Sequence, residues 1–223
     1  MTELPTPRIQ PFTLGDFQTN CFVVTVPQAP TNTASDCWIF DCGFEPQPMF
    51  EFIDAHHLRP RAVILTHAHA DHIAGVDPGL AKYGDLPVYL HHAEKGFCSD
   101  PMLNLSGLMG MNVTCTEPQR WLKDGDTLDI NGTTWRVVHT PGHSPGCVIF
   151  IHDHSKQAIV GDTLFAGSIG RIDFPTSDPR AMRHSIHEII MKLPDDMTIY
   201  PGHMTPTTIG RERTTNPFVL HGF

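Results

Sequence analysis

Short apolar runs separated by turn residues fill the first third of the chain, a pattern typical of β-strands. They predict strands over residues 12–14, 21–26, 38–40 and 62–66. Apolar residues spaced along one helix face predict a helix over 48–58, between the last two of these strands. A short helical stretch and a strand over 88–90 are expected to follow.

The second half repeats this alternation and adds a longer helix. Its expected strands cover residues 128–130, 134–139, 147–151, 158–161 and 197–200. Apolar residues on one side predict a helix over 181–193. Residues 94–120 have no regular pattern and are expected to form either a lid or a covering loop without function. Two sets of strands, each followed by helices, predict an α+β fold in which two sheets pack face to face with helices outside.

Length and composition favour one soluble domain over residues 1–223. A net charge of -9 with only 15 Lys and Arg residues argues against nucleic acid as a partner, because that binding requires clustered cations. No apolar run reaches the roughly 18 residues of a membrane span, and the N-terminus has no signal-peptide pattern. The six cysteines lack CxxC spacing and are expected to be reduced and mostly buried. We therefore expect a cytoplasmic protein with no membrane partner, and its oligomeric state stays open.

Three histidines and an aspartate lie directly after the apolar run 62–66: His67, His69, Asp71 and His72. The first two stand two residues apart, so an extended backbone points both to one face, and the other two lie past a bend where a helical stretch begins. Such polarity at the end of a buried strand would be costly without a partner, so the segment predicts a metal site. The pairs His56-His57 and His91-His92 have no carboxylate at ligand spacing and are interpreted as surface or hydrogen-bonded histidines.

Three further candidate ligands each follow an apolar strand and stand beside a glycine: His143, Asp162 and His203. A glycine lets the backbone turn sharply and approach closely. Taken singly, each of the three is equally well explained as a turn residue. Together with the first cluster they supply seven nitrogen and oxygen ligands, which suits two metal ions that share one bridging carboxylate.

This arrangement resembles the metallo-β-lactamase superfamily, from the strand at residue 38 to the end of the chain. The resemblance implies a four-layer αββα sandwich with the metals at one edge of the sheets. It also implies that one metal is bound by His67, His69 and His143, the other by Asp71, His72 and His203, and that both are bridged by Asp162. Asp41, which directly follows a predicted strand, fits the family's buried aspartate that braces the metal loops, with an ordinary turn aspartate as the alternative.

Within the superfamily, residues 161–175 and 208–218 resemble glyoxalase II, in particular its short bacterial form. Those enzymes hydrolyse S-D-lactoylglutathione to D-lactate and glutathione. Arg171 stands where the family binds the glycine carboxylate of glutathione. The chain is expected to lack the C-terminal helical domain that helps grip glutathione, and Asp173 and Thr205 stand where longer enzymes have assisting tyrosines. The resemblance therefore implies a small-molecule thioester substrate, with glutathione as one candidate for the thiol carrier.

The corresponding mechanistic hypothesis is that a hydroxide shared by two divalent metals attacks the thioester carbonyl. Zinc is the favoured metal, since it lowers the pKa of a bound water to about 7, although His/Asp sites also accept iron or manganese. Asp71 would act catalytically by orienting the hydroxide, and one metal would stabilise the oxyanion. The leaving thiolate would need little help from an acid.

The main alternative is an iron persulfide dioxygenase of the same superfamily, which acts on glutathione persulfide and binds one iron through the equivalents of His67, His143 and Asp162. The surroundings of Ala70 and Cys147 favour it. The segment 201–206 favours the hydrolase, because the dioxygenases usually carry Ala before the equivalent of His203 and Tyr soon after it. A non-catalytic metal-binding or redox module is disfavoured because all seven ligands are present. A β-lactamase or a nuclease is disfavoured because neither a signal peptide nor a basic surface is found.

Overall fold

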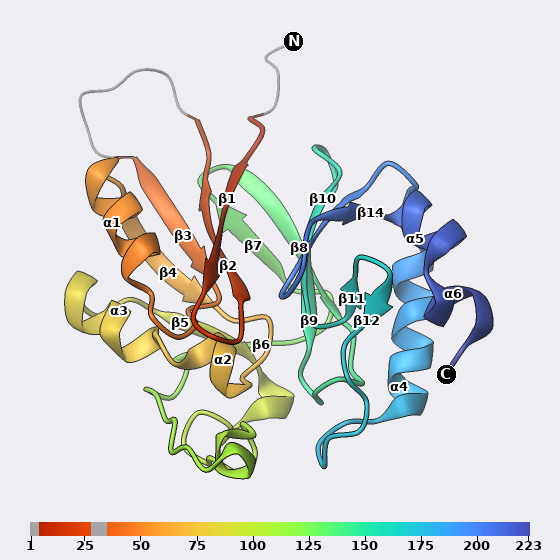
Figure 1. Cartoon of the computed structure of the whole chain (residues 1–223). Coiled ribbons are helices and arrows are strands. Elements are labelled where there is room, and N and C mark those ends of the chain that lie inside the picture. Colours follow the sequence, from red (N-terminus) through yellow and green to blue (C-terminus); the bar gives the residue numbers. More distant parts are fainter. Residues whose placement is uncertain (1–4, 28–34) are drawn as a thin grey trace.

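Two six-stranded sheets form the centre of the molecule, seen in a computed structural model that describes residues 5–27 and 35–223 (Figure 1). The first sheet has the order β1-β2-β3-β4-β5-β6, with strands Arg8–Leu14, Thr19–Thr25, Asp36–Phe40, Arg59–Ile64, Val88–His91 and Arg120–Leu122. Strands β1 to β3 pair antiparallel, and β3 to β6 pair parallel. The parallel half directs the carboxyl ends of β3, β4 and β5 to one edge of the sheet.

The second sheet has the order β14-β13-β10-β9-β8-β7. In chain order its strands are β7 Thr127–Ile130, β8 Thr133–His139, β9 Val148–His152, β10 Gln157–Gly161, β13 Thr198–Pro201 and β14 Thr207–Thr208. A small ribbon of β11 (Leu164–Phe165) and β12 (Ser168–Ile169) follows β10. Strands β10 and β13 are parallel, so both end at the same edge of this sheet.

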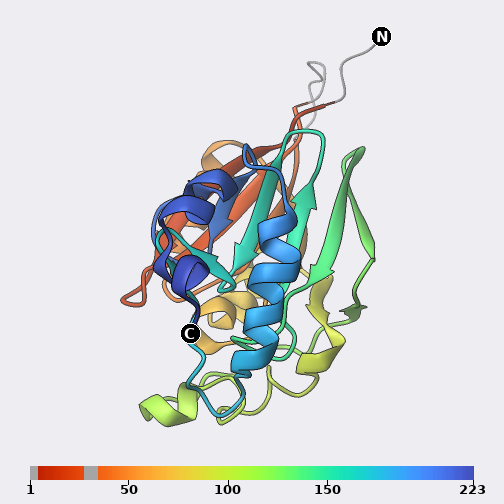
Figure 2. The ribbon, with the colours of Figure 1, turned by 90° about the vertical axis from the view of Figure 1, so that its right-hand side faces the viewer.

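Helices cover the outer faces of both sheets (Figure 1). Those beside the first sheet are α1 Gln47–Ala55, α2 Ala70–Ile73 and α3 Val76–Tyr83, and those beside the second are α4 Pro179–His184, α5 Ile209–Thr215 and α6 Pro217–His221. Figure 2 shows α4 lying along the second sheet. Asp178 caps α4 by accepting hydrogen bonds from the backbone N–H groups of Arg180 (2.8 Å) and Ala181 (3.1 Å).

Three apolar clusters fill the spaces between these layers. Successive side chains of a strand point to opposite faces, so neighbouring residues join different clusters. Ile39 and Ile149 pack outward against the helices of their own sides, whereas Phe40 and Phe150 meet between the sheets with ring centroids 5.1 Å apart. Helix, sheet, sheet and helix thus follow one another, and the expected αββα sandwich is confirmed.

The expected strands are confirmed with boundary shifts of a few residues. The strands β6, β11, β12 and β14 were not predicted, since two or three residues are too short to show an alternation. The helix expected over 181–193 begins at residue 179 and changes from α to a π turn (Ser185–Ile189) and a 3-10 turn (Ile190–Lys192). Within the described residues, no helix has the length and hydrophobicity needed to cross a membrane.

Candidate metal centre

Seven candidate ligands converge at one edge of the sandwich, where strands of both sheets end. They lie after β4 (His67, His69), in α2 (Asp71, His72), between β8 and β9 (His143), after β10 (Asp162) and after β13 (His203). Backbone hydrogen bonds join the two sheets here, from Val148 N to Thr66 O (3.0 Å) and from Asn20 N to Gly202 O (2.7 Å). The ligands therefore sit on a junction that both sheets hold in place.

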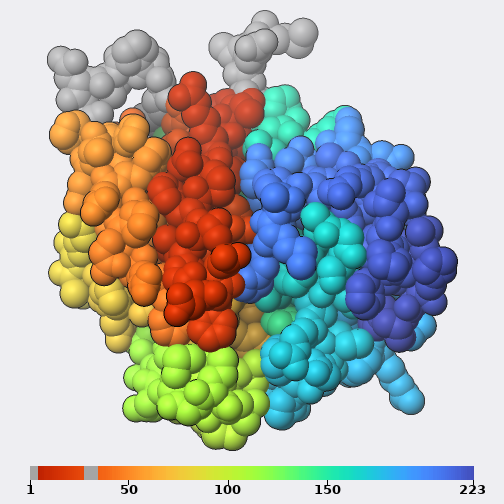
Figure 3. Space-filling view, in the orientation of Figure 1, coloured from red at the N-terminus to blue at the C-terminus, as the bar shows by residue number. Residues whose placement is uncertain are grey.

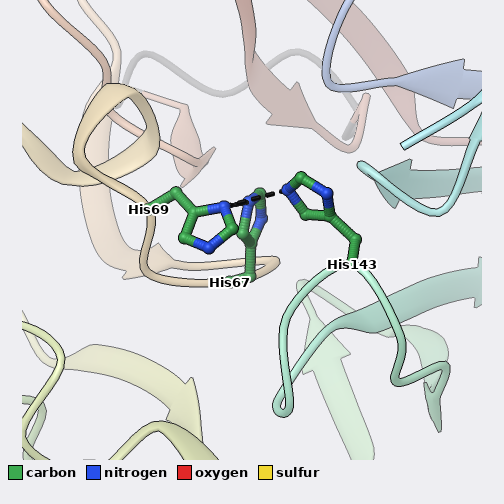
Figure 4. A group of neighbouring side chains, drawn as sticks. All are labelled: His67, His69 and His143. Carbon is green, nitrogen blue, oxygen red and sulfur yellow. Dashed lines mark hydrogen bonds between the residues drawn. The ribbon is translucent and has the colours of Figure 1, made fainter. Parts of the chain in front are cut away.

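Three imidazoles form the first group (Figure 4). His69 Nδ1 lies 3.1 Å from His67 Nε2 and 2.9 Å from His143 Nε2, and one ring nitrogen of each residue can be chosen so that all three lie within 4.8 Å. All three side chains are buried. Two of their outer nitrogens are held separately, since His143 Nδ1 bonds to the Arg171 carbonyl (2.8 Å) and His67 Nδ1 to Thr66 Oγ1 (3.1 Å), whereas His69 Nε2 has no hydrogen-bond partner.

The second group consists of Asp71, His72 and His203, whose ligand atoms also lie within 4.8 Å of one another. Asp71 Oδ2 is 3.4 Å from His72 Nε2 and 3.3 Å from His203 Nε2. Asp162 lies between the groups, because its carboxylate oxygens are 3.4 Å from His72, 3.4 Å from His203 and 3.5 Å from His143. This is the position that a bridging carboxylate would need.

Glycines beside these ligands make the close approach possible. A Cβ at Gly202 would lie 2.2 Å from Asp162 Oδ1. Gly161 has φ of +48° and its Cβ would lie 2.5 Å from Thr66 Oγ1, so a side chain there would be both strained and in collision. The sequence pattern of a ligand beside a glycine therefore has a steric cause.

Burial and charge divide the histidines into two kinds. Burial lowers the pKa of His67, His69 and His143, which leaves these imidazoles neutral with a free lone pair, the form that binds a metal. At His203 burial acts in the same direction, but the Asp162 carboxylate outweighs it and raises the pKa to about 10. Positive charge is thus stabilised beside Asp71 and Asp162, as a divalent cation would be.

Some buried polar atoms at this edge have no hydrogen-bond partner and are placed where they could bind a metal. His72 Nε2 and Asp162 Oδ1 are fully buried, lie 3.4 Å apart, and have no hydrogen-bond partner. Buried polar atoms without partners are costly, and a cation between them would satisfy both. The seven nitrogen and oxygen donors match the ligand preferences of zinc, iron and manganese.

Asp41, expected to brace the metal loops, is completely buried directly after β3. Its carboxylate accepts hydrogen bonds from Thr66 N (2.7 Å) and Thr66 Oγ1 (2.8 Å) and lies 2.9 Å from His72 Nδ1. A carboxylate behind a histidine fixes the ring orientation and leaves the other nitrogen for a metal. This geometry is what the expected supporting role requires.

The comparisons with known proteins agree with this geometry. The sequence model described as "Metallo-beta-lactamase superfamily" matches residues 14–203. The chain belongs to the metallo-beta-lactamase superfamily. It is 38% identical over 188 residues to a Bacillus subtilis protein named "Probable metallo-hydrolase YqgX". This alignment covers 84% of this chain and 88% of the relative. It is 32% identical over 205 residues to "Hydroxyacylglutathione hydrolase GloC" of Haemophilus influenzae, and this alignment covers 91% of this chain and 93% of the relative.

Two solved structures are similar to this chain over nearly its whole length. The crystal structure of the "BLEG-1 B3 metallo-beta-lactamase" has a TM-score of 0.86 and 36% identity, and covers 95% of this chain and 99% of that one. The crystal structure of "TTHA1623 in a di-iron-bound form" has a TM-score of 0.79 and 35% identity, and covers 94% of this chain and 99% of that one. The expected membership, in the glyoxalase II-like part of the superfamily, is confirmed, and the chain is an enzyme of metallo-hydrolase type.

Four other histidines and the six cysteines, also interpreted from the sequence, stand outside the candidate ligand groups. His56 and His57 are exposed, His92 Nδ1 bonds to the Leu122 carbonyl (3.1 Å), and buried His91 stacks on His139. None of the four joins the candidate ligand groups, as the sequence indicated. All six cysteines are buried and free of disulfides, as expected.

Glu94 is a supporting residue that the sequence did not reveal. Its buried carboxylate accepts hydrogen bonds from Ala68 N (2.6 Å), Gly146 N (3.0 Å) and the Ser144 hydroxyl. Burial raises its pKa to about 7, and the three donors oppose that rise. Glu94 thereby ties the loop that carries His67 and His69 to the loop that carries His143. Its place in the short 3-10 turn His92–Glu94 that follows β5, at the edge where β4 also ends, is the signal that could have indicated it.

A cavity of about 570 Å³ opens beside the metal centre. Its floor contains five candidate ligands: His69, Asp71, His143, Asp162 and His203. Part of its wall comes from Asn104, Leu105, Leu108 and Met109, so the irregular segment 94–120 contributes to the cavity. Arg171, expected to bind substrate, also lines the cavity, together with Asp173. Thr205 is exposed and is not a lining residue.

Proposed function

We propose that this chain is a metal-dependent thioester hydrolase of glyoxalase II type, which cleaves S-D-lactoylglutathione or a related acyl-thiol to D-lactate, or the corresponding acid, and a free thiol. The observation that carries the proposal is that five candidate ligands also form the floor of the 570 Å³ cavity. A thioester in that cavity would present its carbonyl carbon to those residues. The relative GloC, named a hydroxyacylglutathione hydrolase, supports this substrate class.

We propose a site for two divalent metal ions, in which Asp162 bridges the two groups of ligands. The neutral imidazoles of the first group and the carboxylates of the second suit zinc, and also iron or manganese. The related protein TTHA1623 was crystallised in a di-iron form, which supports iron as a candidate beside zinc. Metal ions bound here would supply an activated water and an electrophile near neutral pH.

Asp71 is the proposed catalytic residue of the chain itself. Thr19 Oγ1 donates a hydrogen bond to Asp71 Oδ2 (2.7 Å) and fixes the carboxylate. Burial alone would raise the pKa of Asp71, but the charges of His72 and His203 outweigh it and lower the pKa, so the group stays ionised. An ionised carboxylate at the cavity floor can accept a hydrogen bond from the attacking water and orient it. The leaving thiol, with an ordinary pKa of about 8.5, departs as a thiolate without an acid.

The test is the Asp71→Asn variant, assayed with S-D-lactoylglutathione alongside metal analysis of the purified protein. We expect kcat to fall by at least about 100-fold, since a positioned acid–base group contributes about that much. Asp54→Asn is the control, because Asp54 is exposed and pairs with Lys82 away from the cavity. Full turnover by Asp71→Asn with both metals bound would refute the role of Asp71. Wild-type protein with two metals and no thioesterase activity would refute the function.

A second candidate is a mononuclear iron persulfide dioxygenase, since the site contains two histidines and a carboxylate that suit such an iron: His67, His143 and Asp162. The segment 201–206 argues against it, because the dioxygenases usually carry Ala before the equivalent of His203 and Tyr soon after it. Oxygen consumption with glutathione persulfide, one iron per chain and no thioesterase activity would favour this candidate over the hydrolase.

A further inference from the structure

The wall of the cavity above the candidate ligands is largely apolar. Phe17, Leu108 and Met109 line it while keeping 40%, 50% and 45% of their surface exposed. Large apolar side chains exposed at the mouth of a cavity mark a surface that binds an apolar ligand. The segments that carry them, red and yellow-green in Figure 3, adjoin the cyan segment around residue 171 on one face of the molecule.

The charge of the cavity wall is balanced internally. Arg171 donates two parallel hydrogen bonds to Asp173, from Nε to Oδ1 and from the guanidinium NH2 group to Oδ2, both 2.8 Å long. The guanidinium carbon of Arg171 lies 4.2 Å from the centre of the Phe174 ring. This contact helps to hold the guanidinium in its position beside Asp173. Among the described residues that line the cavity, Arg171 is the one Lys or Arg. A substrate carboxylate would therefore meet an Arg171 guanidinium whose positive charge is already neutralised by Asp173.

We propose that the preferred substrates are thioesters with an apolar acyl chain on a thiol carrier without net negative charge, and that Asp173 disfavours anionic carriers such as glutathione. This inference rests on the proposed thioester hydrolysis and specifies its substrate class. A volume of about 570 Å³ lies within the range of cavities that hold drug-sized ligands, so it accommodates an acyl chain longer than lactoyl. Metal ions held by the candidate ligands would act on the reacting carbonyl, which all thioesters share.

The acyl preference is tested with thioesters of N-acetylcysteamine, from acetyl to hexanoyl. We expect kcat/KM to rise about two- to fourfold for each added methylene, the upper value being full burial of the group. Leu108→Asn should reduce this increment. Leu220→Asn is the matched control, because Leu220 is 51% exposed and does not line the cavity. Equal kcat/KM along the series would refute the apolar acyl site.

The carrier preference is tested by binding, with two thioethers that share an alkyl chain: S-hexyl-N-acetylcysteamine and S-hexylglutathione. We expect the wild-type protein to bind the neutral compound at least about fivefold more tightly, and Asp173→Asn to gain about fivefold for the glutathione compound, the size of an exposed ion pair. Asp153→Asn is the matched control, since Asp153 forms the same two-bonded pair with Arg136 (2.6 and 2.9 Å) outside this cavity.

The two levels of the proposal fail differently. Tighter binding of S-hexylglutathione by the wild-type protein, with efficient hydrolysis of S-D-lactoylglutathione, would overturn the substrate class and leave the hydrolase intact. Hydrolysis of no thioester by protein that carries two metals would overturn the hydrolase itself.

Discussion

Glu94 holds together the two loops that carry the first group of ligands. Its two carboxylate oxygens serve three donors, two of which are the backbone N–H groups of Ala68 and Gly146. In Glu94→Gln one of these N–H groups would face the amide NH2, and a buried donor without an acceptor costs about 1–3 kcal/mol. We therefore expect the free energy of unfolding to fall by about that amount in denaturant titrations at a fixed metal concentration.

Glu117→Gln provides the comparison for Glu94→Gln. Glu117 accepts one exposed hydrogen bond, from Ser99 Oγ (2.8 Å), so its substitution should leave the free energy of unfolding close to that of the wild-type protein. Equal stability of Glu94→Gln and Glu117→Gln would show that the two loops keep their places without the carboxylate.

The candidate ligands could be predicted as a set, because each follows an apolar strand or lies in the polar cluster after one, although His143, Asp162 and His203 taken singly fit a turn equally well. For Glu94 the sequence offers only its place shortly after a predicted strand, because its partners Ala68 and Gly146 are 26 and 52 positions away and bind through backbone atoms that have no signature in the sequence. The pairing of Arg171 with Asp173 was also missed. Arg171 was predicted to contact substrate and Asp173 was noted as a departure from the longer enzymes, and only the structure shows that their charges meet each other.

Residues 104–109 supply part of the cavity wall within the segment 94–120, and Asn104 connects them to the rest of that segment. The Asn104 side chain donates to the carbonyls of Phe97 (3.0 Å) and Val113 (2.9 Å) and accepts from Ser106 N and Oγ, while its backbone oxygen accepts from Ala70 N in α2. The hydrogen bonds of one polar side chain thus hold this segment together, as backbone hydrogen bonds hold a helix or a sheet. This explains why no hydrophobic pattern indicated the structure.

We expect Asn104→Ala to loosen this segment without unfolding the sandwich. The loss of four side-chain hydrogen bonds should expose residues 99–114 to limited proteolysis and raise KM for the thioester, since Leu105, Leu108 and Met109 belong to the cavity wall. Mass spectrometry of the fragments and steady-state kinetics measure the two effects. Ser99→Ala, which removes exposed side-chain hydrogen bonds, should behave as wild type, and an Asn104→Ala protein that resists the protease equally would contradict the assignment.

At the scale of the whole molecule, the candidate metal centre is built from both sheets of the sandwich. The layer order was predictable because alternating strands and amphipathic helices have only a few ways to bury their apolar faces. The ligands belong to both sheets, since His67 follows β4 of the first and His143, Asp162 and His203 follow strands of the second. A metal bound at this junction therefore links the two sheets in the folded state and has no equivalent site in the unfolded chain.

Removal of the metals should consequently lower the stability of the entire fold. A ligand that binds only the folded state contributes about 2.7 kcal/mol at 100 times its dissociation constant, which for a chain of this size corresponds to a melting temperature roughly 5–10 °C higher. We expect a chelator to produce this decrease in thermal melting experiments and added zinc to reverse it. In His203→Asn the chelator should lower the melting temperature by less, because the second group would have lost a ligand. In His56→Asn, a change at an exposed position, the chelator should lower it as much as in the wild-type protein. If the chelated and metal-loaded proteins melt at the same temperature, the unpartnered atoms His72 Nε2 and Asp162 Oδ1 do not hold a metal that stabilises the fold.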